Sequence, residues 1–361
     1  MRLQLTRAAG AALAVHAACV GAAVAQDGDG AVRVRSALYQ DDDATTVVTA
    51  AVEANAVVAE SVGIRAGYLI DAITTASVDV VTAATERWDE RRDEARGGVD
   101  VFLGEATVNA GVVRSIENDY DSWTVSLGGS VDLAQRATTL GVGLGWIDSD
   151  VGRADDPAFH GDQQTLTATL RAVQVLSPDT LGAVSYALIR VDGLQSSPYR
   201  YVRVGDGTAV LERHPTERLR HALTARVRHS LSPSIAFGVD ERLYADDWGM
   251  IATTTNVVLA LSLSETLDLE LRNRFHFQRA VSFWQERYDQ QRRFVSVDRE
   301  LSTFLDDYAG PALIWSVRDA GPFDRLRADV RADVFYYRFL DYAYLDGRVG
   351  TLVSIGVEGA W

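Results

Sequence analysis

Strict alternation of apolar and polar residues is the dominant pattern of this chain. In "LDLELRNRFHFQ", residues 267–278, leucines and phenylalanines take alternate positions between charged or polar ones, and only Asn273 interrupts the apolar series. A period of two predicts a β-strand with one apolar and one polar face. The pattern recurs in "WTVSLGGSVDL", "LGVGLGW", "RLRHALTARVR" and "LRADVRADVFY". Because no stretch after the first 25 residues keeps a helical period, we expect an all-β protein.

The lengths of the strands and connections favour a transmembrane barrel. The predicted strands run for roughly 10–14 residues, longer than is usual in soluble sheets and suited to tilted membrane strands. Short connections rich in Ser, Pro, Asp and Gly alternate with long ones near residues 73–90, 149–162, 193–214 and 279–297. Short periplasmic turns and longer extracellular loops are typical of outer-membrane proteins. Counting from "AVRVRSALY", residues 31–39, predicts a closed antiparallel transmembrane β-barrel of about 16 strands.

The chain ends on "GTLVSIGVEGAW", which alternates like the other strands and stops at Trp361. An aromatic residue at the end of a membrane strand suits the interfacial belt. We therefore expect Trp361 to mark the strand that closes the barrel, and this strand to be the part that the barrel-assembly machinery contacts.

The first 25 residues resemble an export signal. Arg2 and Arg7 precede a small, apolar stretch that ends in an A-x-A site at residues 23–25. We predict a cleaved signal peptide over residues 1–25 and a single barrel domain over residues 26–361. The sole cysteine, Cys19, lies inside the signal. No later run of about 18 apolar residues exists, so only a closed barrel can span a bilayer. The predicted location is the bacterial outer membrane, in contact with lipid and lipopolysaccharide.

The net charge limits the partners. The formal charge is −15, and loss of Arg2 and Arg7 with the signal changes it to −17. Such a surface repels phosphate backbones, so nucleic acid is not expected as a partner.

Energetics predicts which strand face turns inward. A basic residue at mid-depth on the lipid side costs roughly 2–4 kcal/mol, so charged faces are expected to line the lumen and to pair across strands. The residues predicted to line the lumen are Asp268, Glu270, Arg272, Arg274, Arg218, Arg220, Arg325, Arg327, Asp329 and Arg331. Aromatic pairs at strand ends are expected to form interfacial belts. They are Tyr199–Tyr201, Tyr244–Trp248, Trp284–Tyr288 and Tyr342–Tyr344.

Nine aspartates lie beside aromatic residues near the predicted long loops. They are Asp41, Asp42, Asp43, Asp119, Asp121, Asp246, Asp247, Asp306 and Asp307. The favoured interpretation is a solvated acidic rim. A second is a divalent-cation site, since carboxylate oxygens suit Ca²⁺ and Mg²⁺, although no EF-hand spacing occurs. A third is a catalytic carboxylate pair. No other cofactor is expected. No hydrolase or phosphate-loop motif is present, so no catalytic residue is assigned.

Several short segments resemble a family of proteobacterial outer-membrane proteins of unknown function. "RSALYQDDD" carries its tyrosine-plus-acid motif, Asp71, Ala76 and Ser77 match a D-x-x-x-x-A-S segment, and residues 117–120 match its E-x-D-Y segment. "LYADDWG" adds to the likeness, whereas Val78 stands where the family often has proline. The resemblance implies a β-barrel without an assigned activity. It also implies an envelope redox role, because related genes often lie beside flavin-transfer and thioredoxin-like genes.

Taken together, the patterns predict a porin-like channel or an accessory membrane component of an envelope system. Two alternatives remain: a surface hydrolase that uses rim carboxylates, and a structural or binding barrel closed by ion pairs and residues 73–98. Residues 71–85, which overlap that segment, either continue a strand or fold into the lumen. A soluble all-β exoprotein is the alternative fold.

Overall fold

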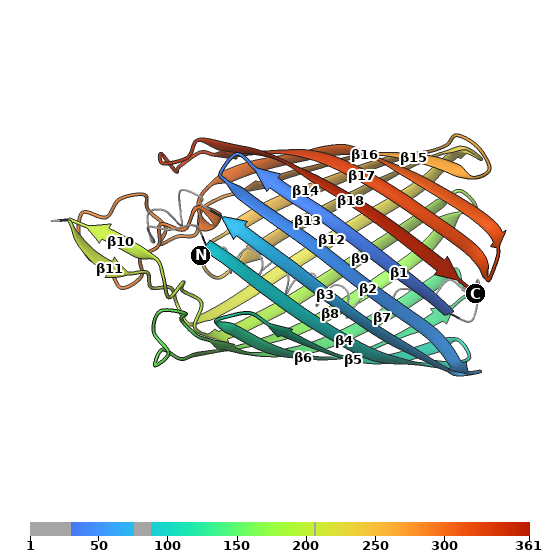
Figure 1. The fold of residues 1–361 in the computed structure, drawn as a ribbon, viewed down its shortest axis with the longest axis horizontal. Coiled ribbons are helices and arrows are strands. Elements are labelled where there is room, and N and C mark those ends of the chain that lie inside the picture. The colour runs from blue at the N-terminus through green and yellow to red at the C-terminus, as the bar shows by residue number, and fades with distance from the viewer. Residues whose placement is uncertain (1–29, 76–87, 206) are drawn as a thin grey trace.

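The computed structural model describes residues 30–75, 88–205 and 207–361, and sixteen of its strands form one closed barrel (Figure 1). The predicted fold class and strand number are therefore confirmed. The barrel strands are β1 (Gly30–Asp41), β2 (Thr45–Ala59), β3 (Val62–Thr75), β4 (Trp88–Leu103), β5 (Ala106–Ile116), β6 (Tyr120–Leu133), β7 (Thr138–Val151), β8 (Gly161–Ser177), β9 (Thr180–Gly193), β12 (Glu217–Ser232), β13 (Ile235–Asp246), β14 (Ile251–Ser262), β15 (Leu267–Gln278), β16 (Phe304–Ala320), β17 (Phe323–Phe339) and β18 (Gly347–Ala360).

Each barrel strand pairs antiparallel with its neighbours, and β1 pairs with β18 to close the cylinder. Trp361 continues this seam, because its backbone N–H and C=O each form a 3.0 Å hydrogen bond with Gly30. Trp361 is 40% exposed at the end of the barrel where the tight turns lie. Among the described residues, no helix is long and apolar enough to cross a membrane.

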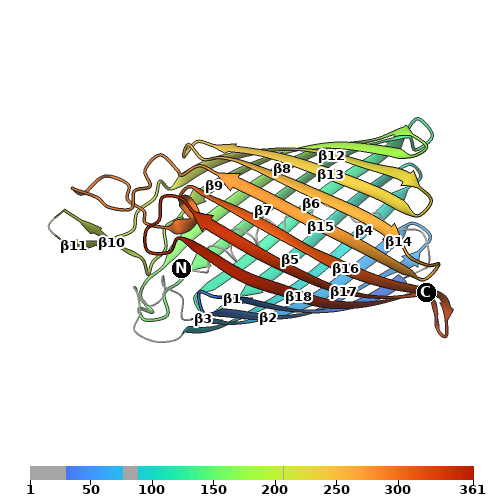
Figure 2. The ribbon, with the colours of Figure 1, turned by 90° about the horizontal axis from the view of Figure 1, so that it is seen from above.

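The two ends of the barrel differ. Tight turns join the strands at the end that holds Trp361, which we call the short-turn end. The opposite, long-loop end carries segments 152–160, 194–216 and 279–303 (Figures 1 and 2). Within segment 194–216, a hairpin of β10 (Tyr201–Val204) and β11 (Thr208–Leu211) extends beyond the barrel.

Part of the predicted loop over residues 73–98 belongs to the barrel wall. The segment "WDERRDEAR" belongs to β4, so residues 88–98 are not available as a lumen plug. Its inward charges are held by neighbours: Arg92 binds Asp71 at 2.6 Å and Arg96 binds Glu53 at 2.9 Å. The charges therefore serve as the polar face of a strand. The predicted alternatives for residues 76–85 lie outside the described residues.

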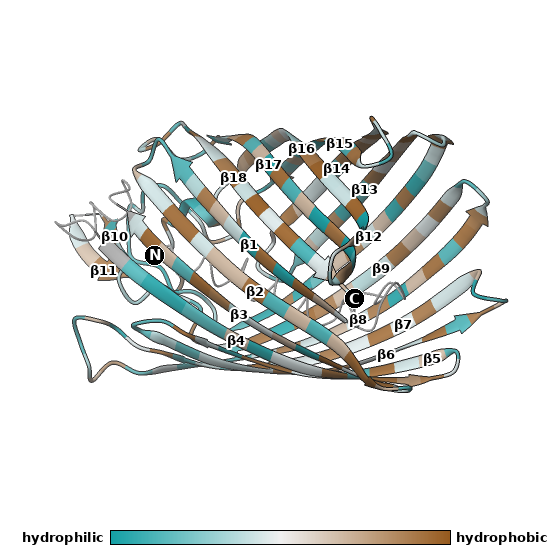
Figure 3. Ribbon diagram, turned by 45° about the vertical axis from the view of Figure 1, so that its right-hand side comes forward, coloured by the Kyte–Doolittle hydropathy of each residue, from teal (hydrophilic) through white to brown (hydrophobic). Residues whose placement is uncertain are grey.

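Hydropathy alternates along the strands (Figure 3), and many of the apolar residues are exposed on the outer face. Val34, Leu144 and Val334 are typical outward residues, each more than half exposed. Exposed aliphatic side chains of this number are stable only against hydrocarbon, which is the arrangement of membrane barrels.

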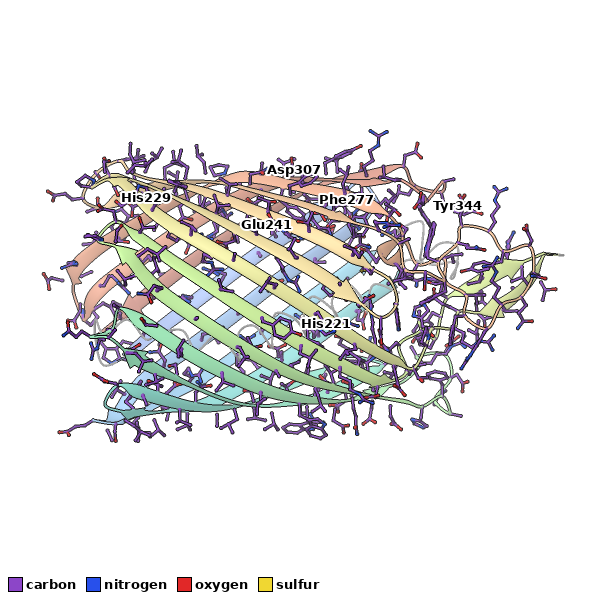
Figure 4. All side chains as sticks on the ribbon, turned by 180° about the vertical axis from the view of Figure 1, so that it is seen from behind. His221, His229, Glu241, Phe277, Asp307 and Tyr344 are labelled. Atoms are coloured by element: carbon purple, nitrogen blue, oxygen red, sulfur yellow. The ribbon has the colours of Figure 1, made fainter. Side chains whose placement is uncertain are left out.

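Not every polar residue turns inward, contrary to the simplest expectation. Figure 4 labels His221, Glu241 and Asp307 on strands β12, β13 and β16, and the register places all three on the outward face. Each has a neighbouring partner: Tyr186 lies 2.7 Å from His221, Thr255 donates to Glu241 at 2.6 Å, and Asn273 donates to Asp307 at 2.6 Å. Mutual hydrogen bonding lowers the free-energy cost of keeping such groups on the outer wall.

Candidate functional site: the lumen and its cap

The residues predicted to line the lumen all lie on inward strand faces. On β15, Arg272 crosses to Asp333 of β17 at 2.8 Å, and Arg274 pairs with Asp306 of β16. Asp268 and Glu270 face inward on the same strand, and neither forms an ion pair with a residue that the structure describes. Most of the pairing joins different strands, as opposite charges on one wall favour.

The remaining predicted lumen residues lie on β12 and β17. Arg325 lies 3.3 Å from Glu358, and Asp329 accepts from Arg331 at 3.0 Å. Arg327 faces inward between them. Arg218 donates from Nε to Asp246 at 2.8 Å, whereas Arg220, two residues along, has no such partner among the described residues.

A cluster of aromatic side chains occupies the inner wall at the long-loop end. Phe335 of β17 stacks on Tyr39 and Tyr308, with ring centroids 5.0 and 5.1 Å apart. Phe304 and Phe339 continue the cluster at 5.6 Å from each other. These rings are an inward-facing core within the barrel mouth.

The predicted aromatic belts are largely wrong. Of the eight residues, only Tyr201 and Tyr344 are exposed. Trp248, Trp284, Tyr288 and Tyr342 are each less than 10% exposed and pack in the mouth or the loops above it. Tyr244 points inward because it shares the strand parity of Arg242 and Asp246. Composition at a strand end does not distinguish the two faces, whereas parity does.

Segments 194–216, apart from residue 206, and 279–303 pack together into one structure that we call the cap. Its core consists of Val202, Val204, Tyr288 and Val295, all buried. Arg213 and Val295 exchange two backbone hydrogen bonds of 3.0 and 2.9 Å across the segments. The two longest described loops therefore form a single folded unit.

A buried charged network holds the two segments of the cap together. Arg200 contacts Glu212 at 2.8 Å and Asp298 at 2.6 Å, and all three side chains are at most 5% exposed. Ser296 donates to Glu212 at 2.6 Å, and His214 lies 3.4 Å from the same carboxylate. Removal of one member of a buried network leaves its partners uncompensated, so this network makes the cap cooperative.

Electrostatics keeps Glu212 ionised. Burial by itself raises the pKa of this carboxyl, but Arg200, His214 and the Ser296 hydroxyl outweigh burial and lower the pKa to about 2.

The cap reaches across the mouth of the barrel. Within segment 279–303, Arg299 binds Asp43 of the β1–β2 turn at 2.7 Å, Ser282 donates to the Trp248 carbonyl of the β13–β14 turn at 2.8 Å, and Thr303 accepts from Leu340 of the β17–β18 loop at 2.9 Å.

Segment 194–216 makes the corresponding contacts on the other side. The Tyr199 hydroxyl donates to Asp119 of the β5–β6 loop and accepts at 2.7 Å from Ala154 of the β7–β8 loop. Together, the two segments bond to every described connection at the long-loop end.

Three of the nine predicted rim aspartates stabilise the β1–β2 turn. Asp41 accepts from the Thr45 N–H and Asp42 from the Val349 N–H, each at 2.9 Å. Asp43 is the buried partner of Arg299. Their carboxylates therefore bind turns and the cap.

Asp246 and Asp247 stabilise the β13–β14 turn. Asp246 accepts from the Trp248 N–H at 3.0 Å besides binding Arg218, and Asp247 accepts from the Leu219 N–H at 3.0 Å. These acids are also occupied by donors of the protein.

Asp121, Asp306 and Asp307 lie on different faces of the wall. Asp121 binds Arg114 at 2.7 Å, and Asp307 lies with it on the outer face, whereas Asp306 faces the lumen beside Arg274. The nine residues do not form one rim surface, because strand parity separates neighbours in sequence.

One group of carboxylates includes a predicted rim residue. Glu90, Glu117 and Asp119 offer oxygens that all lie within 4.8 Å of one another, and Glu90 and Asp119 are buried. Carboxylates at this spacing are a ligand set that Ca²⁺ or Mg²⁺ takes. The Tyr199 hydroxyl also donates to Asp119.

The short-turn end is hollowed. A cavity of about 480 Å³ is bounded by residues of β8, β9, β12, β13, β14 and β15, among them Arg228, Gly238 and Glu270. The lumen therefore has space at this end, opposite the cap.

Acid will loosen the cap. The folded pKa of Glu212 is about 2, below the ordinary 4.5, so its stabilisation is complete above pH 4.5 and is lost as pH falls from there toward 2. Trp284 reports on the event because its indole donates to the Asp298 carbonyl at 2.8 Å. We expect the fluorescence difference between wild type and Trp284→Phe to shift to the red over this range. In Glu212→Gln the same titration is expected to be flat, and an unchanged titration contradicts this assignment.

No sequence pattern predicts the cap network. Arg200, Glu212 and Asp298 are separated along the chain and share no motif. A local signal existed in "RYVRVGDGTAVLER", where apolar alternation flanks a Gly-Asp-Gly turn, the pattern of a hairpin.

Comparisons with known proteins agree on the fold. The sequence model of a family described as "Protein of unknown function (DUF3570)" matches residues 84–160 and 152–310. No curated protein sequence matches the chain.

Among solved structures, a bacterial polysaccharide outer membrane secretin is similar with a TM-score of 0.50 at 11% identity, over 92% of this chain and 98% of that one. CdiB from Acinetobacter baumannii is similar with a TM-score of 0.50 at 7% identity, over 91% of this chain and 60% of CdiB. The siderophore receptor PirA from Pseudomonas aeruginosa has a TM-score of 0.45 at 12% identity, over 86% of this chain and 56% of the receptor. At such identities, the first two show that this chain has the fold of an outer-membrane barrel.

Proposed function

Because this chain belongs to the DUF3570 family of proteins of unknown function, we propose its function from the geometry of its own barrel: a channel whose long-loop mouth is closed by the cap. One observation carries the proposal. The cap bonds to every described connection at that end, while the opposite end is hollowed by a cavity of about 480 Å³. Such an arrangement suits a conduit that opens when its cap moves.

We place the protein in the bacterial outer membrane after export through a cleaved signal peptide. The outward aliphatic faces support this location, as does the likeness in fold to outer-membrane barrels. The long-loop end, with the cap, then faces the exterior, and the short-turn end faces the periplasm. The lumen of a barrel of about 16 strands is wide enough for water and small solutes.

Conductance in planar bilayers tests the proposal. The wild-type protein is expected to give brief, infrequent openings, and a variant without residues 197–213 is expected to conduct for most of the recording. Heat-modifiable migration on gels verifies that the shortened barrel is closed. Silence from both proteins at high protein density contradicts the channel and leaves a structural barrel.

A further inference from the structure

The inward face of β12 carries four arginines, and one of them has no carboxylate partner. Arg218 binds Asp246, while Arg226 and Arg228 share Asp240, the former at 3.0 Å.

Arg220 forms no ion pair or hydrogen bond with any residue in the described ranges, and its Nε is buried without a partner. Arg220 as a whole is half-buried. A partly buried cation without an ion-pair partner is unfavourable, so this position invites a negatively charged ligand.

Two further arginines on the same wall, the half-buried Arg242 and the exposed Arg171, also form no ion pair with a described residue. Arg242 of β13 lies in register with Thr224 of β12, four residues along the strand from Arg220. Its Cζ lies 5.8 Å from the ring centroid of Tyr244, whose register partner Ala222 lies midway between these two positions. Arg171 of β8 lies on the same register line, through Ser185 of β9. In the part of the chain that the structure describes, neither forms an ion pair.

Asp240 and Asp246 are the acids on the inward face of β13, and both already bind arginines of β12. The inward faces of β8 and β9 carry no acid, whereas Arg272, Arg274 and Arg325 on the opposite side each meet one. The cavity at the short-turn end is bounded by the same strands, so it gives access to the wall.

We propose that Arg220 and Arg242, with Arg171 at the edge, form a binding site for a small oxyanion inside the lumen. A guanidinium offers paired donors that match phosphate or carboxylate oxygens. The site rests on the proposed channel in one respect: if the barrel conducts, the site indicates that small oxyanions are the solutes. Phosphate can bind to the site whether or not the barrel conducts.

Calorimetric titration of the detergent-solubilised protein with inorganic phosphate, at constant ionic strength, tests the site. Because each guanidinium contributes charge-assisted hydrogen bonds, Arg220→Gln with Arg242→Gln is expected to weaken phosphate binding about tenfold or more. The matched control is Arg327→Gln on β17. Arg327 also faces the lumen and forms no ion pair with a described residue, but it lies on another part of the wall. This change is expected to alter the phosphate affinity less than about twofold. Gel migration confirms that each barrel is closed.

Three outcomes overturn the site: no phosphate binding by wild type, an equal loss in Arg327→Gln, or chloride binding as strong as phosphate. The last two indicate a diffuse positive field. Reversal potentials in a phosphate gradient separate the proposals. Phosphate binding without current supports the binding site and contradicts the channel. Current without phosphate binding supports the channel and contradicts the binding site.

Discussion

Replacement of Arg200 by methionine will separate the two segments of the cap. The change leaves Glu212 and Asp298 buried side by side without their shared cation, and breaking a buried pair in this way costs about 3–5 kcal/mol. Since 1.4 kcal/mol is a factor of ten, the population with separated cap segments is expected to rise roughly 100-fold or more. We expect proteinase K to cleave residues 194–216 and 279–303 far faster than in wild type, and channel openings to lengthen.

The control for this experiment lies on the same hairpin. Arg203 is exposed on β10, so Arg203→Met removes the same charge and adds the same side chain without touching the network. It is expected to leave the cleavage rate within about twofold of wild type, as a surface change does. Equal cleavage rates for the Arg200 and Arg203 variants would show that the network does not hold the two segments of the cap together.

Replacement of Gly310 by alanine will destabilise the barrel wall. An added Cβ overlaps the Ala332 carbonyl oxygen and lies 2.7 Å from the Asp333 Cα, both backbone atoms of β17. Gly310 also stands opposite Arg272, which passes over this position to reach Asp333. Overpacking and loss of the ion pair together are expected to lower the free energy of unfolding by at least about 3 kcal/mol.

Urea unfolding in detergent measures this effect, with Gly141→Ala as the comparison. Gly141 also faces the lumen, but its nearest atom to a new Cβ is 3.6 Å away, an ordinary contact. We expect its unfolding midpoint to match wild type. Equal unfolding midpoints for Gly310→Ala and Gly141→Ala would contradict this prediction. They would mean that β16 and β17 can move apart at Gly310 without lowering the free energy of unfolding.

The wall of the barrel was predictable from sequence, because two local rules determine it. A period of two identifies each strand, and the cost of charge in hydrocarbon decides which face turns inward. Arg272 and Arg327 were placed on the lumen side by these rules alone. The same parity places Tyr244 inward, whereas assignment by composition predicts it in an interfacial belt.

The cap was not predictable by those rules. Its network joins residues 200, 212 and 298, which no periodicity relates, and its stability comes from tertiary burial. Local sequence also does not predict which arginines lack an ion-pair partner. The register of β12 with β13 sets Asp246 opposite Arg220, but the side chain of Asp246 binds Arg218 instead, and no sequence pattern predicts that choice.

A reversible lock across the cap tests the central claim most directly. Arg213 and Val295 form a hydrogen-bonded antiparallel pair, a geometry whose Cα separation of about 5.5 Å suits a disulfide. The only native cysteine, Cys19, lies in the predicted signal. In an Arg200→Met background, Arg213→Cys with Val295→Cys is expected to pass little current when oxidised and to open on addition of reductant, while Arg200→Met alone ignores the reductant. The same current before and after reduction would contradict a cap that closes the lumen.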